Sequence, residues 1–185
     1  MGIQEKYKVV LISGSPSETS RSDYVLKYLE MNLKQHQVET TYISIQEVPF
    51  GDLFYANFNS SFIKGIIETI HEADGVIIGS PVYQGSYTGV LKTLLDLLPQ
   101  NVFQSKVVLP IMVGGSPSHL LALDYTLKPL IALLKGQSLR GVYILDTLID
   151  RTKDNPIIDD EINERIDRQF NRLLKTIRKK QSFIH

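Results

Sequence analysis

The sequence contains no cysteine, which excludes disulfides, thiolate nucleophiles and cysteine-ligated zinc or iron–sulfur sites. Its four histidines are scattered without the spacing of a metal site, so we expect no bound metal. A charge surplus is missing too, because 20 Lys and Arg residues balance 20 Asp and Glu residues. Nucleic acid, whose binding needs clustered cations, is therefore a poor candidate for a partner.

Long apolar runs are also absent. No run approaches the roughly 20 residues that a membrane-spanning helix needs, and residues 1–6 lack the apolar centre of a secretion signal. We therefore expect a cytoplasmic protein with no membrane partner. With 185 residues, 43% of them apolar, and no internal repeat or linker, the chain is predicted to form a single domain over 1–185.

What is present is an alternation of two patterns. Short β-branched or alternating runs predict strands at residues 8–13, 38–45, 75–79, 106–113 and 141–145. Apolar residues at helical spacing predict helices at about 20–35, from a cap at Ser60 or Ser61 through Ile70, and at 86–98, 119–135 and 159–180. This order predicts an α/β fold, a doubly wound five-stranded parallel sheet with helices on both faces.

Two of the predicted helices bear on assembly. The helix at 86–98 has a second apolar edge, Val90 and Leu97, and the helix at 119–135 is apolar almost all round. Because Pro129 removes a helical hydrogen bond and clashes with the carbonyl of Tyr125, we expect a kink or π-bulge there. A bent core helix would explain these features. We favour burial between subunits, which predicts a homodimer or homotetramer.

The first of three polar loops follows a buried strand and opens a helix, at residues 13–22. In doubly wound sheets ligands bind beyond the carboxyl ends of the strands, which is where this loop lies. Backbone N–H groups at a helix start and several serine hydroxyls suit a phosphate. No Walker A or GxGxxG sequence occurs, and a plain turn with capping serines is the alternative.

The other two loops, at residues 80–89 and 114–119, add a flat slot and polar edges. The glycines of the second loop let a ring approach the backbone, and Tyr83 or Tyr87 can cover it; the alternative is a turn with one buried tyrosine. In the third loop paired glycines expose N–H donors beside Ser118 and His119, although such a histidine is often only a helix cap. The combination suits a mononucleotide such as FMN.

At these loops the chain resembles the NADPH-dependent FMN reductases, specifically those of two-component alkanesulfonate monooxygenase systems. The resemblance covers about residues 8–146 and is carried by Gly14-Ser15-Pro16 with Ser20-Arg21-Ser22, by SPVY at 80–83 with TGVLKTLLDLLP at 88–99, by KVVLP at 106–110 with Gly114-Gly115 and HLLA at 119–122, and by DYTLKP at 124–129. Family members have an arginine directly after the Gly-Ser-Pro turn, where this chain has Ser17; Arg21 or the helix-terminal amides could compensate.

The resemblance implies a flavodoxin-like fold, hydride transfer from NADPH to FMN and release of reduced FMN to a flavin-dependent monooxygenase. The chain is similar in its helix 119–135 to reductases in which that helix packs across a tetramer interface. No catalytic acid or base is expected, because the cofactors carry the hydride chemistry. The implied contacts are Ser13, Ser15, Ser20, Arg21 and Ser22 for the phosphate, Pro81, Val82, Tyr83, Gln84, Gly85 and Ser86 for the isoalloxazine, and Gly114, Gly115, Ser118 and His119 for its pyrimidine edge.

Other functions stay open at this point. An FMN-bound quinone, azo-dye or chromate reductase would share the fold and the loops, since spacing does not show whether the flavin leaves. A flavodoxin-type electron carrier would have an acidic surface and a threonine-rich phosphate loop, and a scaffold protein would leave the three loops unexplained. NADPH rather than NADH rests on the resemblance, because no obvious arginine cluster marks a 2′-phosphate site.

Overall fold

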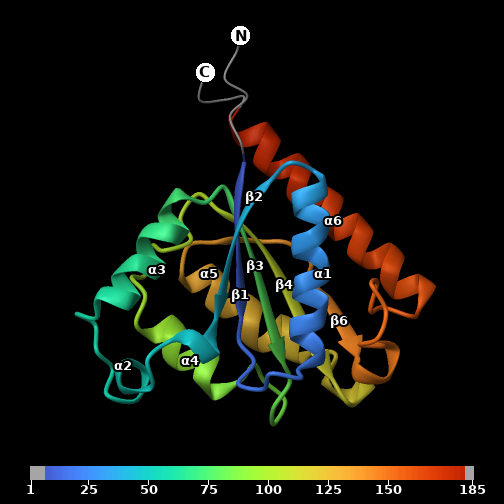
Figure 1. Cartoon of the computed structure of the whole chain (residues 1–185), viewed down its shortest axis with the longest axis horizontal. Coiled ribbons are helices and arrows are strands. Elements are labelled where there is room, and N and C mark those ends of the chain that lie inside the picture. The colour runs from blue at the N-terminus through green and yellow to red at the C-terminus, as the bar shows by residue number, and fades with distance from the viewer. Residues whose placement is uncertain (1–6, 182–185) are drawn as a thin grey trace.

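A parallel sheet in the order β2-β1-β3-β4-β5 forms the centre of the fold, and β6 also pairs with β4 (Figure 1). The computed structural model describes residues 7–181, so both ends of the predicted domain lie outside the described residues. The strands are β1 (Lys8–Ser13), β2 (Glu39–Ser44), β3 (Gly75–Pro81), β4 (Val107–Gly114), β5 (Gln137–Ser138) and β6 (Val142–Leu145). The predicted doubly wound parallel sheet is confirmed.

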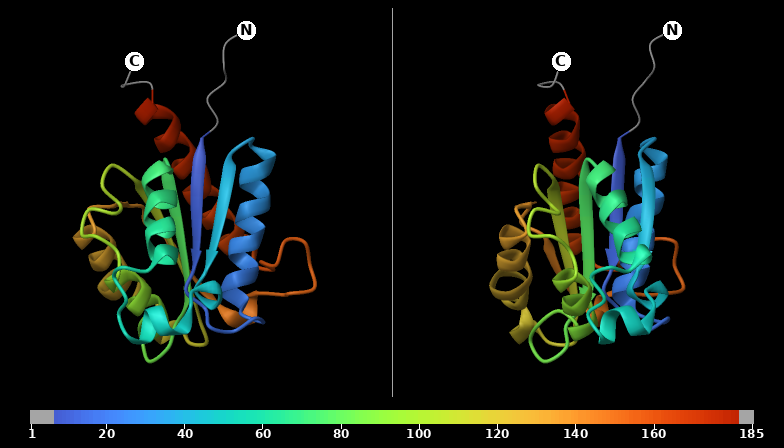
Figure 2. Two further views of the ribbon diagram at one scale, coloured as in Figure 1. Left: turned by 60° about the vertical axis from the view of Figure 1, so that its left-hand side comes forward. Right: turned by 90° about the vertical axis from the view of Figure 1, so that its left-hand side faces the viewer.

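Helices cover both faces of this sheet (Figure 2). One face carries α1 and α6, and the other carries α3, α4 and α5. The helices are α1 (Arg21–Gln35), α2 (Phe50–Phe54), α3 (Ser61–Glu72), α4 (Gly89–Asp96), α5 (Lys128–Leu133) and α6 (Asp160–Gln181), of which only α2 was not predicted. Within residues 7–181, none of these helices has the length and apolarity needed to cross a membrane.

The central strands are apolar on both sides because each side meets a layer of helices. In β1, Val9 and Leu11 join the core under α1 and α6, while Val10 and Ile12 join the core under α3, α4 and α5. All four are at most 2% exposed, and burying each such side chain stabilises the fold by about 1.5–3 kcal/mol. This double burial explains why these strands appear in the sequence as continuous apolar runs.

The fifth strand differs from the prediction. The sequence predicts one strand at 141–145, but the structure has two short pieces, β5 and β6, along the same edge of β4. The Leu139 N–H donates to the Val108 carbonyl at 2.8 Å, and Pro110, two residues further on, faces the same neighbour without an N–H to offer. Gly141 (φ +72°) passes there so closely that a Cβ would lie 2.5 Å from the Pro110 carbonyl oxygen. The proline therefore divides the strand.

The predicted helix at 119–135 is also divided. A 3₁₀ turn at Pro117–His119 leads into a π-helix at Leu123–Leu127, and α5 begins at Lys128 with Pro129 in its first turn. The expected π-bulge near Tyr125 is confirmed, and its cause is the N–H that Pro129 lacks. Leu127 and Ile131 are fully buried, whereas Tyr125 and Leu133 are exposed.

The boundaries of α4 and its expected apolar edge need correction. The sequence predicts a helix at 86–98, but α4 begins at Gly89 because the Thr88 side chain caps it by accepting the Leu91 N–H. The predicted second apolar edge of Val90 and Leu97 is wrong for Leu97, which lies at the C-cap of α4 and is only 4% exposed. Val90 alone remains on the surface, so α4 has no apolar edge beyond its core face.

Candidate functional site at the carboxyl edge of the sheet

The three predicted loops meet in one groove at the carboxyl ends of β1, β3 and β4. The groove has a volume of about 300 Å³. Its lining consists of Ser17, Thr19, Ser20, Arg21, Ser22, Pro81, Val82, Tyr83, Val113, Gly114, Gly115, Asp146 and Arg151. Because β1 pairs with both β2 and β3, the chain reverses its strand order at β1, and the groove lies at this switch point.

The first wall of the groove is the amino-terminal end of α1. Within the described chain, the side chain of the N-cap residue Ser20 makes no capping bond. Its Oγ is instead hydrogen-bonded to the Ser22 Oγ at 2.8 Å. The Asp23 N–H of the first turn donates to the Ser20 carbonyl at 3.1 Å, so the Arg21 and Ser22 amides, both of groove-lining residues, are the ones left for a ligand. Uncapped amides, hydroxyls and a guanidinium form a site for an anion.

Ser13, at the end of β1, and Ser15, in the loop that follows, lie outside the lining of the groove. Both are fully buried. The Ser15 Oγ accepts the Ser17 N–H at 3.1 Å and so closes the turn, while Ser13 lies beside the Tyr42 hydroxyl. Both residues therefore lie inside the loop, and their assignment to the phosphate stays a prediction.

A buried carboxylate stands behind the same loop. The Tyr42 hydroxyl donates a hydrogen bond to Asp23, which also forms an ion pair of 2.8 Å with Lys27. Burial raises the pKa of the Tyr42 hydroxyl well above its usual value, and the bond to Asp23 raises it further. The Asp23 carboxylate lies in the first turn of α1, where it interacts favourably with the helix dipole.

The second wall is a tight hairpin turn that presents Tyr83. Tyr83 and Ser86 exchange two backbone hydrogen bonds of 2.8 and 3.1 Å. Gln84 (φ 49°) and Gly85 (φ 75°) both have the positive φ of a type I′ turn. Tyr83, 48% exposed, lines the groove, whereas Gln84, Gly85 and Ser86 build the turn behind it. Tyr87 instead packs against the core, in agreement with the alternative prediction of a turn with one buried tyrosine.

The third wall consists of Gly114 and Gly115 at the end of β4. The Tyr143 hydroxyl occupies the space beside Gly114 and donates to the Ser116 carbonyl. A Cβ on Gly115 would meet only the Asp146 Oδ2, at 3.6 Å, so this stretch of backbone is open to a ligand. The predicted site residues Ser118 and His119 lie in the following 3₁₀ turn, outside the lining.

Several lining residues were missed by the sequence analysis. Ser17 and Thr19 belong to the predicted loop, but Asp146 and Arg151 come after β6, in a stretch to which no function was assigned. The Arg151 Nη1 donates to the Thr19 carbonyl oxygen at 3.0 Å, across 132 residues of sequence. A usable signal exists: β6 is parallel to β4, so the residues directly after β6 also reach the carboxyl edge of the sheet.

The donors of the groove fit a flavin mononucleotide. Hydroxyls, uncapped amides and two guanidinium groups suit its phosphate, an exposed tyrosine suits its flat ring, and open glycine backbone suits its polar edge. A metal ion has no comparable site, since residues 7–181 contain no cluster of three or more histidine or carboxylate side chains able to hold one.

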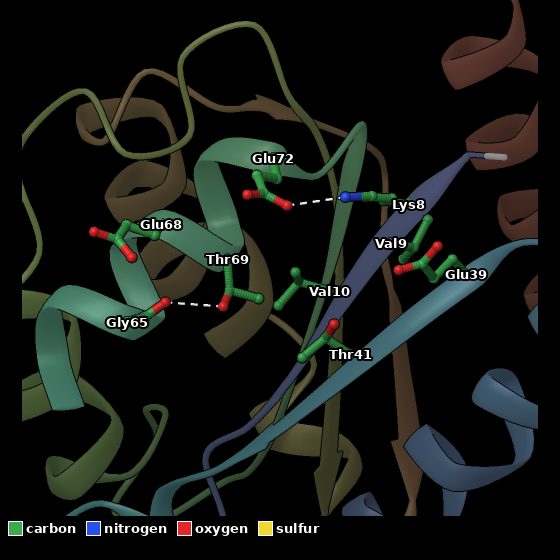
Figure 3. A pocket seen from close by; sticks show the side chains of 9 residues that line it. All are labelled: Lys8, Val9, Val10, Glu39, Thr41, Gly65, Glu68, Thr69 and Glu72. Atoms are coloured by element: carbon green, nitrogen blue, oxygen red, sulfur yellow. Dashed lines mark hydrogen bonds and ion pairs between the residues drawn. The ribbon is translucent and has the colours of Figure 1, made fainter. Parts of the chain in front are cut away.

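A second hollow, of about 320 Å³, lies between α3 and the first residues of β1 and β2 (Figure 3). The Lys8 Nζ and Glu72 Oε2, 2.9 Å apart, form an ion pair across it. This contact raises the pKa of Lys8 and lowers that of Glu72. Its other charged lining side chains, Glu39 and Glu68, are both acidic, so the lining has a surplus of negative charge that disfavours a phosphate.

Known proteins match this chain over most of its length. The model of the family "NADPH-dependent FMN reductase" matches residues 7–149. An FMN reductase (NADPH) of Escherichia coli is 41% identical over 161 residues, covering 86% of this chain and 84% of the relative. An FMN reductase (NADPH) of Pseudomonas putida is 42% identical over 142 residues, covering 76% and 72%.

Among solved structures, an NADH:FMN oxidoreductase (EMOB) in its apo form superposes with a TM-score of 0.79 at 28% identity. The match covers 95% of this chain and 90% of that structure. The matched family segment contains β1 through β6 and all three predicted loops, so the shared part includes most of the groove. Arg151 lies just beyond it.

Proposed function

The chain belongs to the NADPH-dependent FMN reductase family, and from this premise we propose that the groove at the carboxyl edge of the sheet is its FMN site. The enzyme is an oxidoreductase with FMN and NADPH as its cofactors. The observation that carries the proposal is the meeting of the α1 terminus, Tyr83 and Gly114-Gly115 in one groove.

Each wall has a distinct task in this proposal. The hydroxyls and amides of Ser20 and Ser22, with Arg21, bind the phosphate, and the buried Ser13 and Ser15 hold that loop in shape. Tyr83 covers the flavin ring together with Pro81 and Val82. The turn of Gln84, Gly85 and Ser86 fixes the direction of Tyr83, because it leaves the tyrosine backbone no freedom to rotate.

The remaining contacts concern the edge of the ring and the chemistry. Amides of Gly114 and Gly115 bind the pyrimidine edge, and Ser118 and His119 border it from the next turn. When bound, FMN accepts the hydride that NADPH donates. The protein would hold the two rings against each other, and because the hydride passes directly between the cofactors, no side chain of the groove has to transfer a proton.

The flavin leaves after reduction in this proposal. The E. coli and P. putida relatives are named for FMN as the compound that they reduce, which favours FMN as a substrate rather than a permanently held group. The product then serves a flavin-dependent monooxygenase, of the alkanesulfonate type by resemblance. A cytoplasmic setting is part of the proposal, since NADPH is an intracellular coenzyme.

A homodimer or homotetramer completes the proposal. The stretch from the end of the 3₁₀ turn through α5 exposes apolar side chains that the single chain leaves uncovered: Leu120 is 52%, Leu121 56%, Tyr125 74% and Leu133 63% exposed. Several large exposed apolar groups within one short segment are typical of a protein–protein contact. We propose that a second copy of the chain covers it.

The test is NADPH oxidation at 340 nm with flavin-stripped protein, with and without added FMN, and with NADH in parallel. We expect turnover that saturates with FMN at micromolar concentration, and reduced FMN that accumulates in solution without oxygen. Turnover that needs a quinone or azo acceptor, with the flavin still bound after dialysis, would contradict the release of flavin. Absence of flavin binding would contradict the proposed site itself.

A further inference from the structure

The phosphate loop carries no net charge of its own. Residues 13–22 contain one cation, Arg21, and one anion, Glu18. A phosphate monoester carries about −1.5 to −2 charges near neutral pH, so a loop with zero net charge compensates it poorly. A second cation in the groove would therefore strengthen the binding that Arg21 and the helix-terminal amides provide.

Arg151 is positioned to be this cation. It lines the same groove as Arg21, and its Nη1 donates to the carbonyl of Thr19, the residue just before the N-cap of α1. One N–H of its guanidinium is used in this contact and the remaining donors stay available. Among the described residues, neither Arg21 nor Arg151 forms an ion pair with a carboxylate, so both charges are uncompensated.

The segment that carries Arg151 is a built hairpin rather than a loose loop. Ile149 and Ile157 face each other in an antiparallel bridge and are 6% and 3% exposed, which anchors the hairpin in the core. At its tip the Asp150 carboxylate accepts the Thr152 N–H at 3.0 Å, an Asx-turn that spans Arg151. The Thr152 hydroxyl also donates to this carboxylate, at 2.6 Å, and together with the N–H bond it lowers the pKa of Asp150. Figure 2 shows this segment, in orange, beside the amino-terminal end of α1.

We propose that Arg151 binds the phosphate of FMN opposite Arg21, as a second guanidinium contributed by the hairpin after β6. This inference rests on the proposed FMN site and adds to it a specificity residue from outside the loop. The contact with Thr19 orients the guanidinium. A charge-assisted hydrogen bond from Arg151 to the phosphate favours FMN over riboflavin, which has the same ring without the phosphate.

The test compares FMN with riboflavin in binding to flavin-free protein, measured by the change in flavin fluorescence. We expect Arg151→Gln to weaken FMN binding about tenfold and to reduce its dependence on salt, while riboflavin binding changes less than about twofold. Lys153→Gln is the matched control, because it removes the same charge from the same hairpin outside the groove, and it should change neither value. Thermal unfolding verifies that both variants fold.

The outcomes separate this inference from the proposed site. Equal weakening of FMN and riboflavin by Arg151→Gln would assign the residue a purely structural role and overturn the inference. An increased KM for NADPH with unchanged FMN binding would assign the guanidinium to the coenzyme phosphate and overturn it as well. Wild-type protein that binds FMN no better than riboflavin, or neither of them, would overturn the phosphate site at α1 and this inference together.

Discussion

The hydroxyl of Thr88 donates a hydrogen bond to the carbonyl oxygen of Gly14 and so joins the second loop of the groove to the first. The same hydroxyl oxygen accepts the Leu91 N–H at 3.1 Å and caps α4. The Thr88 N–H in turn donates to the Ser80 Oγ at 3.1 Å. One buried side chain thus sets the distance between the proposed phosphate site and the turn that carries Tyr83.

Thr88→Val should cost about 2 kcal/mol of stability, because an isosteric methyl leaves the Gly14 carbonyl and the Leu91 N–H buried without this partner. It should also increase the KM for FMN, since the two loops lose their link. Urea unfolding and steady-state kinetics measure both effects. Thr93→Val, which removes an exposed hydroxyl bond to Gly89 in the same helix, is the control and should change neither. Equal stability of the two variants would contradict the role of Thr88.

Tyr42 should make the protein sensitive to alkaline pH. Its raised pKa means that the folded state keeps the phenol proton above pH about 10, where the unfolded chain releases it. The stability that Tyr42 contributes is therefore fully present below pH about 10 and decreases as the pH rises above it. Denaturant unfolding of wild type and Tyr42→Phe across this range should show their stabilities converging. A constant difference between the two proteins at all pH values would contradict this explanation.

Tyr83→Ala should weaken FMN and riboflavin binding alike, by about fivefold, because a stacked ring contact does not involve the phosphate. This pattern is the opposite of the one expected for Arg151→Gln. Fluorescence titration with both flavins measures it. Tyr55→Ala, which removes an exposed tyrosine outside the groove, is the control. A loss confined to FMN would show that Tyr83 contacts the phosphate rather than the ring.

Leu133→Glu should convert the proposed oligomer into a monomer of 20.9 kDa, because the added charge would be buried against the second copy. Light scattering after gel filtration gives the mass directly. Met31→Glu is the control: Met31 is 47% exposed on α1, on the other side of the sheet, and its replacement should leave the mass unchanged. A wild-type chain that is already a monomer would contradict the proposed contact.

Local features of the fold could be predicted because short-range chemistry determines them. The N-cap bonds of Ser60 to the Phe62 and Ile63 N–H groups, 3.2 and 3.4 Å long, are expected of a serine before an apolar helix. The π-helix at Leu123–Leu127 results from Pro129, which has no N–H to donate to the carbonyl of Tyr125 four residues earlier. Neither depends on what the rest of the chain does.

Other features depended on neighbours far along the chain. Its helical spacing predicts Leu97 on a second apolar edge of its helix, yet its side chain is buried in the core. The fifth strand breaks because Pro110 of the adjacent β4 lacks a donor, which the sequence of 137–145 itself does not indicate. Seven of the expected site residues border or support the groove rather than line it, since a loop's polar residues divide between its ligand side and its inner side.

Patterns among neighbouring residues were sufficient to specify the buried strands, the three loops at their carboxyl ends and the family, because periodicity, turn chemistry and motif blocks are local properties of the chain. Tertiary packing selected which side chains of those loops face the groove. It also brought Arg151 to Thr19, 132 residues away. The parallel order of the strands places the residues after β6 at the carboxyl edge of the sheet, but the pairing of Arg151 with Thr19 arises from the packing of the whole sheet and its helices.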